Sequence, residues 1–145
     1  MDFNFFEECY RIINKYNKKT AKPQQYGTED MLYPAEVHLI NTIGNHDRVT
    51  VTELATLFGI TKGAVSQTTS KLIKKQLIEK TPSENEKNVV FISLSEKGRI
   101  VYDYHWAMHR KSREKIDMIL GNLSPQEQNS VKEIITTLDE MLDNM

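Results

Sequence analysis

The feature that most constrains the fold is a glycine that separates two amphipathic segments near the middle of the chain. Thr50 and Glu53 have the three-residue spacing of a capping box, which predicts a short helix that begins there. Gly59 supplies the tight turn after it, and Thr61 can cap a second helix that runs to about Gln76. Two short helices joined by a glycine turn predict a helix-turn-helix.

The second of these helices has two unlike faces. Val65, Leu72 and Ile73 share an apolar face, whereas the opposite face carries hydroxyl, amide and ammonium groups and no carboxylate. Such a face suits a groove lined by phosphates and base edges, with Gln67 able to pair with an adenine edge and the lysines with phosphates. The predicted DNA-contacting residues, with one lysine from the segment that follows, are Thr61, Lys62, Gly63, Ser66, Gln67, Ser70, Lys71, Lys74 and Lys87.

Two β-prone runs follow, at 77–81 and 89–94, separated by a polar, turn-rich segment at 82–88. They predict an antiparallel hairpin, which beside a helix-turn-helix is a wing. Apolar periodicity and caps predict four further helices. These lie at 5–16, 34–44, 96–120 and 124–142, with a loop at 18–28. The predicted fold class is therefore mostly α (α+β), a winged helix-turn-helix with a two-stranded wing.

The terminal helices carry more apolar surface than so small a core needs. We therefore expect these helices to form a two-fold interface with a second copy of the chain. The resulting homodimer would bury the apolar faces of residues 5–16 and 131–142. The chain is then a single domain, 1–145, in which residues 34–98 form the winged helix-turn-helix and residues 1–30 and 100–145 the dimerisation helices. A dimer sets two recognition helices about one turn of DNA apart, which predicts a pseudo-palindromic duplex-DNA operator.

Net charge alone argues against a nucleic-acid partner, because the chain carries a formal charge of −1. The distribution points the other way. Residues 61–80 carry a charge of +4, whereas residues 117–145 carry −5. Basic charge is thus gathered on the segment that holds the predicted recognition helix, with an acidic face elsewhere.

Four sequence blocks resemble the central part of the MarR family of winged-helix regulators in order and spacing: Thr52–Ala55, Gly59–Ser66, Leu72–Ile78 and Leu94–Gly98. The order of predicted elements extends this resemblance over essentially the whole chain. The resemblance implies an obligate dimer that binds DNA, here a repressor that responds to a small-molecule, acyl or metal effector. The chain departs from the family at the wing, where an Asp-Arg-Arg-like tip is common, because Lys87 is the only cation at 83–88.

Three histidines are consistent with either a zinc site or a structural role without metal. His105 and His109 are four residues apart and share a helix face, and His38 lies on a helix that crosses near the start of the long helix in this fold. Their pattern is similar to the ligand pattern of the zinc-responsive branch of the family, which implies a zinc site. It is also similar to members that control fatty-acid synthesis, for which no metal role is implied, and histidines hydrogen-bonded in a hinge require no cofactor.

Other function classes have less support. The sequence shows no glycine-rich phosphate loop and no Gly-x-Ser-x-Gly elbow, so we expect no catalytic activity. The lone Cys9 falls on an apolar helix face, which favours packing over a redox role. No apolar run approaches the length of about 20 residues that a membrane-spanning helix needs, so we expect a cytoplasmic protein without a membrane partner. The main rival is a winged-helix protein-interaction module that uses the same helix face.

Overall fold

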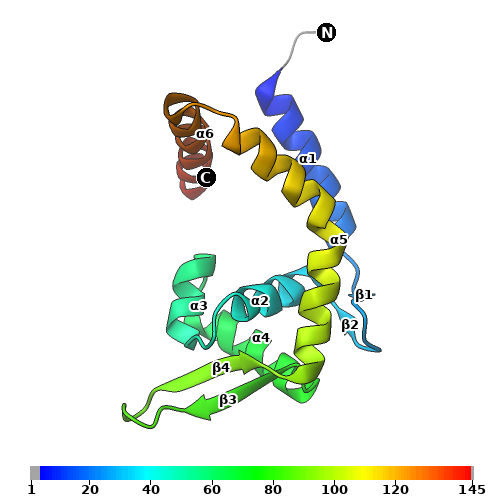
Figure 1. Cartoon of the computed structure of the whole chain (residues 1–145), viewed down its shortest axis with the longest axis vertical. Helices are drawn as coiled ribbons and strands as arrows, with labels where there is room; N and C mark the ends of the chain where they lie inside the picture. Colours follow the sequence, from blue (N-terminus) through cyan, green and yellow to red (C-terminus); the bar gives the residue numbers. More distant parts are fainter. Residues whose placement is uncertain (1–3, 145) are drawn as a thin grey trace. The chain divides into compact units, whose positions relative to one another are not determined.

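The structure, a computed structural model, describes residues 4–144 and divides into two compact units, Met1–Ala107 and Met108–Met145. The predicted helices and wing are present, which confirms the predicted fold class (Figure 1). In chain order the elements are α1 (Phe5–Thr20), β1 (Gln24–Gln25), β2 (Met31–Leu32), α2 (Pro34–Gly44), α3 (Val51–Phe58), α4 (Lys62–Lys74), β3 (Ile78–Pro82), β4 (Val90–Leu94), α5 (Glu96–Gly121) and α6 (Pro125–Asp143).

The helix-turn-helix forms from the caps that the sequence predicts. Thr50 Oγ1 accepts a hydrogen bond of 3.2 Å from the Glu53 backbone N–H, and Glu53 Oε2 accepts one of 2.7 Å from the Thr50 N–H. Gly59 ends α3 with a left-handed φ of 61°, a conformation that carries no Cβ penalty in glycine. Thr61 Oγ1 then accepts from the Ala64 N–H at 3.1 Å and begins α4.

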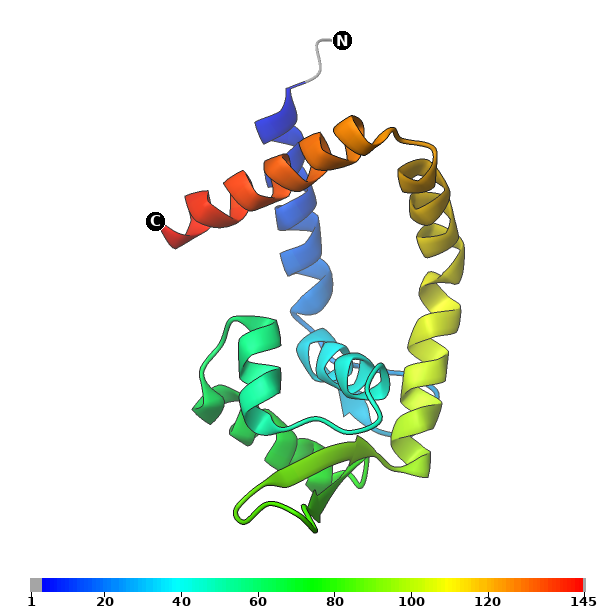
Figure 2. The same ribbon diagram turned by 60° about the vertical axis from the view of Figure 1, so that its left-hand side comes forward.

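The wing is an antiparallel pair of strands with a short third member. β3 pairs with β4 in a register that runs from Ile78 opposite Leu94 to Pro82 opposite Val90. Val49 and Ile92 exchange two backbone hydrogen bonds, which attaches the chain before α3 to the edge of β4. In both views the hairpin lies below α2 and α3 (Figures 1 and 2).

The buried apolar core lies between Tyr26 and Val101, within the first unit. The helices outside that stretch contribute none of their side chains to it, since α1 and α6 have no buried residues. The core is made of Tyr26, Leu32, Val37, Leu39, Ile40, Ile43, Val49, Leu54, Ala55, Val65, Leu72, Leu77, Ile78, Ile92 and Val101.

The start of α5 is packed tightly onto the chain that leaves α4. Ser95 Oγ accepts from the Gly98 N–H at 3.0 Å and donates to the Gln76 carbonyl oxygen at 2.6 Å. A Cβ at Gly98 would lie 1.9 Å from the Leu77 carbonyl oxygen. Only glycine therefore permits this approach of helix to backbone.

Three local predictions differ from the structure. The first helix continues to Thr20, beyond the point where its apolar pattern stops, and β1 and β2 pair within a stretch predicted in part as loop. That hairpin is held by tertiary burial of Tyr26 and Leu32. α4 ends at Lys74, earlier than predicted, because Gln76 adopts a left-handed φ of 59°.

Within residues 4–144, no helix has the length and apolar character needed to cross a membrane.

Candidate DNA-binding surface

α4 presents most of the predicted contact residues on one exposed face. Val65, Thr69 and Leu72 are buried on the opposite side of the helix and fix its rotation against the core. The exposed members of the predicted set on this helix are Lys62, Gly63, Ser66, Gln67, Ser70, Lys71 and Lys74. Thr61 precedes them as the cap, and Lys87 is exposed in the loop of the wing.

Two hydroxyl groups of this face already take part in intrahelical hydrogen bonds. The Thr61 oxygen accepts the Ala64 N–H, so the hydroxyl can still donate its hydrogen and accept one further hydrogen bond. Ser70 Oγ donates to the Ser66 carbonyl oxygen at 2.8 Å, so it is left as an acceptor. The Gln67 amide makes no such bond in residues 4–144, which leaves both its donor and its acceptor able to pair with a base edge.

The basic residues of this surface have different roles. Among the described residues, Lys62, Lys71 and Lys74 form no ion pair within 4.0 Å of a carboxylate. Their charges are therefore available to phosphates. Lys75 faces inward instead, because its Nζ lies 3.1 Å from Glu36 Oε1 and donates to the Met31 carbonyl oxygen at 3.0 Å.

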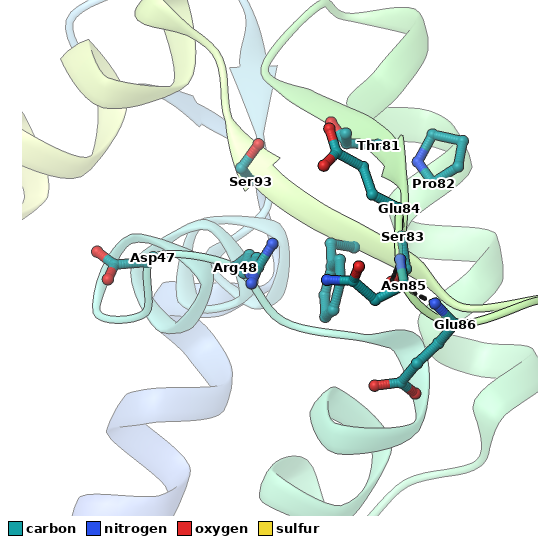
Figure 3. A pocket seen from close by; sticks show the side chains of 10 residues that line it. Asp47, Arg48, Thr81, Pro82, Ser83, Glu84, Asn85, Glu86 and Ser93 are labelled. Carbon is teal, nitrogen blue, oxygen red and sulfur yellow. Dashed lines mark hydrogen bonds between the residues drawn. The ribbon is translucent and has the colours of Figure 1, made fainter.

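The side chain of Ser83 accepts hydrogen bonds from the backbone of the loop of the wing. Ser83 Oγ accepts from the backbone N–H of Asn85 at 3.3 Å and of Glu86 at 3.1 Å. Beside it lies a cavity of about 360 Å³ between the hairpin and the loop that precedes α3 (Figure 3). Its lining residues are Asp47, Arg48, Thr81, Pro82, Ser83, Glu84, Asn85, Glu86, Phe91 and Ser93.

Arg48 is the residue of this surface that sequence reasoning missed. Its Cζ lies 4.5 Å from the centroid of the Phe91 ring, so the guanidinium stacks on the outer face of the wing. The signal in the sequence was slight: one β-branched residue, Val49, between this arginine and the Thr50 cap. A single apolar residue does not predict a strand, and the pairing of Val49 with Ile92 places Arg48 there.

The structure brings two of the three histidines together. The ring centroids of His38 and His105 are 5.7 Å apart, with His105 buried and His38 exposed. His109 belongs to the second unit. No group of three or more His, Cys, Asp or Glu side chains within residues 4–144 is arranged to hold a metal ion.

A second cavity, of about 280 Å³, lies beside His38 in the first unit. Apolar side chains make up most of its wall, and the polar groups of Tyr16, His38 and Thr68 complete it. This combination suits a small, mainly apolar ligand with one polar end. The remaining lining residues are Ala35, Leu39, Phe58, Ile60 and Val65.

The chain is similar in sequence to the HTH-type transcriptional regulator PchR of Bacillus subtilis (strain 168). It is 28% identical over 107 residues, which cover 74% of this chain and 63% of PchR. The chain therefore spans less than two thirds of the length of this relative.

Cys9, the lone cysteine, is half-buried on α1.

Solved structures show the same fold over nearly the whole chain. FabT of Streptococcus pneumoniae, in complex with DNA, superposes with a TM-score of 0.68 at 24% identity and covers 97% of this chain and 99% of FabT. ZitR of Lactococcus lactis, described as a zinc-responsive MarR family member, gives a TM-score of 0.62 at 19% identity over 96% of this chain and 99% of ZitR. These likenesses support the fold of a winged-helix protein.

The sequence model of the MarR family matches residues 32–87, which contain α2, the helix-turn-helix and β3, and end before β4. The regulator-type relative and the whole-chain agreement in fold are consistent with that match. The chain is thus similar to the MarR family in its central part, residues 32–87, and to winged helix-turn-helix proteins in its fold.

Proposed function

We propose that this chain is a transcriptional regulator that binds duplex DNA in a sequence-specific manner, as a homodimer on a pseudo-palindromic operator. One observation carries the proposal. The exposed face of α4 holds three lysines without ion pairs in residues 4–144, together with Gln67 and two serines, and no carboxylate. A duplex offers matching partners, phosphates for the lysines and base edges for the amide.

The test is equilibrium binding of the purified protein to the intergenic DNA beside its own gene, followed by fluorescence anisotropy. A regulator should prefer that DNA to a scrambled duplex by at least about a thousandfold, and the logarithm of its affinity should fall linearly with the logarithm of salt concentration. A protein-interaction module, the rival function, would show neither behaviour. A flat salt dependence with no sequence preference would therefore refute DNA regulation.

A homodimer is supported by exposed apolar side chains on the terminal helices. Ile135 and Leu142 on α6 are 61% and 57% exposed, and Ile12 on α1 is 58% exposed. Exposed apolar side chains of this kind are typical of a surface that a second copy covers. Replacing Ile135 and Leu138 with Asp should give monomers in sedimentation, because an unpaired charge in an apolar seam costs several kcal/mol. An unchanged dimer would exclude α6 from the interface.

For the effector we propose a small, mainly apolar molecule in the cavity beside His38, with repression relieved by its binding. Zinc at His38, His105 and His109 is the competing effector. Calorimetric titration with zinc separates the two, because a zinc site loses affinity as pH falls through about 6.5, where free histidine becomes protonated. Absence of zinc binding, together with operator affinity that a chelator does not change, would remove the metal alternative.

A further inference from the structure

Arg48 occupies a position that the helix-turn-helix and the wing share. Val49 and Ile92 are buried, and strand alternation therefore turns their neighbours Arg48 and Phe91 toward the outer face of the sheet. There the guanidinium lies over the Phe91 ring. Arg48 lines the wing cavity (Figure 3). It also lines a groove beside α3, so it stands at the boundary between the two.

The charge of Arg48 is not neutralised within the described part of the chain. Asp47, Glu84 and Glu86 line the same cavity, yet no carboxylate oxygen in residues 4–144 lies within 4.0 Å of the guanidinium. Stacking on a ring uses the face of the guanidinium and leaves its in-plane N–H donors directed outward. The arginine is thus held in place while its donors face solvent.

The wing itself carries more carboxylates than cations. The segment 78–94 carries three glutamates, Glu79, Glu84 and Glu86, and two lysines, Lys80 and Lys87, for a net charge of −1. Phosphates repel a hairpin of that charge. Arg48 comes from outside the hairpin and adds a third cation beside it, on the same loop as Asp47.

We propose that Arg48 is a DNA-contacting residue that binds a backbone phosphate beside the wing, and that Phe91 is its positioning residue. The inference rests on the proposed function, since it assigns one more contact to the same DNA complex. A guanidinium that presents its edge matches two oxygens of one phosphate, and the ring holds that edge in a fixed orientation before DNA arrives. A lysine at the hairpin tip has no such support.

The experiment compares Arg48→Gln with Arg99→Gln in salt-dependent operator binding. Arg99 is a matched control, because it is also an exposed arginine stacked on a ring, with its Cζ 4.9 Å from the Tyr102 centroid, but it lies on α5. Arg48→Gln should weaken specific and non-specific DNA alike, by about tenfold at low salt. Its slope of log affinity against log salt should be shallower by about 0.9, the value for one phosphate. Arg99→Gln should leave the slope unchanged.

Phe91 variants test the positioning role. Phe91→Leu keeps every charge, so the salt slope should remain while affinity falls by about two- to fivefold through loss of the cation–π contact. Phe91→Tyr keeps the ring and should restore the wild-type affinity. If Phe91→Leu lowers melting temperature but not affinity, Phe91 packs the wing and does not position Arg48.

The outcomes separate this inference from the proposed function. If the wild-type protein binds its operator with a steep salt slope and Arg48→Gln binds with the same slope and affinity, Arg48 makes no phosphate contact and the inference is wrong. If the wild-type protein shows no salt-dependent binding, the proposed function itself fails. Melting temperature serves as the folding control, and Arg48→Lys, which retains the charge, should keep the slope with an intermediate affinity.

Discussion

Lys75 Nζ lies 3.1 Å from Glu36 Oε1, which joins the end of α4 to the first turn of α2. The second carboxylate oxygen of Glu36 accepts the Tyr33 N–H at 2.8 Å, and Lys75 also donates to the Met31 carbonyl oxygen. Glu36 is 7% exposed, so this carboxylate has little contact with water. The pair therefore fixes the C-terminal end of α4 against the first turn of α2.

Removing one partner of this pair should destabilise the fold. Lys75→Met leaves a buried carboxylate with one hydrogen bond fewer, which costs about 1–3 kcal/mol of unfolding free energy. Urea denaturation measures the loss, and the double variant Lys75→Met, Glu36→Gln should lose less than the sum of the two single variants. Strictly additive losses would mean that the two side chains do not interact.

The proposed roles of Gln67 and Lys74 differ in sequence dependence. Gln67→Ala should relax preference at one operator position by about 1–3 kcal/mol, because a base edge loses its partner. Lys74→Ala should weaken all sequences alike and reduce the salt slope by about one. Binding to a panel of single-position operator variants distinguishes the two. Equal, sequence-independent losses would contradict the assignment of Gln67 to base recognition.

Gly98→Ala should be among the most damaging small substitutions in the chain. The added methyl group would meet the Leu77 carbonyl oxygen, a backbone atom that cannot rotate away, and the overpacking should cost about 3 kcal/mol. Gly63→Ala is the control, because the nearest atom to its Cβ is Thr61 Oγ1 at 3.8 Å. That change should be neutral or stabilise α4 by up to about 1 kcal/mol. Thermal unfolding of both variants checks the contrast.

The cap of α3 should contribute to stability in a pH-dependent manner. Hydrogen bonds from the Thr50 backbone N–H and hydroxyl lower the pKa of Glu53 below its ordinary value of 4.5. A lowered pKa means that this stability is fully present above pH 4.5 and is lost as pH falls through the folded-state value. Glu53→Gln retains the acceptor and removes the charge, so the variant should differ from wild type near neutrality and converge with it in acid.

Chemical denaturation at a series of pH values measures that difference. A gap between wild type and Glu53→Gln that stays constant from about pH 7 to pH 3 would assign the effect to shape and not to the carboxylate charge. The exposed position of Glu53 keeps the expected effect small.

Local signals accounted for the central helices and the wing. The capping box at Thr50 and the left-handed turn at Gly59 depend on residues within a few positions of one another, and the sequence is sufficient to predict them. The β1–β2 hairpin depends on distant residues: Lys97 Nζ lies 2.8 Å from Asp30 Oδ2 and 3.0 Å from Glu29 Oε1. Two-residue strands have no periodicity from which to predict them.

In the candidate site too, the features set by local sequence were predicted and those set by distant contacts were not. Helical periodicity predicted which face of α4 is exposed, because rotation about a helix axis follows from Val65 and Leu72 alone. It did not predict Arg48, whose position depends on a ring on β4 across the sheet. The proximity of His38 and His105 was predicted from the crossing of two helices, whereas a three-ligand arrangement needs distances that spacing does not supply.

α6 buries none of its side chains within the single chain. If the proposed homodimer covers α6, this helix is stabilised by mass action, and the melting temperature of the protein should rise with protein concentration. Operator occupancy should then depend on the square of the monomer concentration wherever dimers are scarce. Cells that halve the amount of this protein would lose more than half of the bound operator, and gene dosage would itself become a regulatory signal.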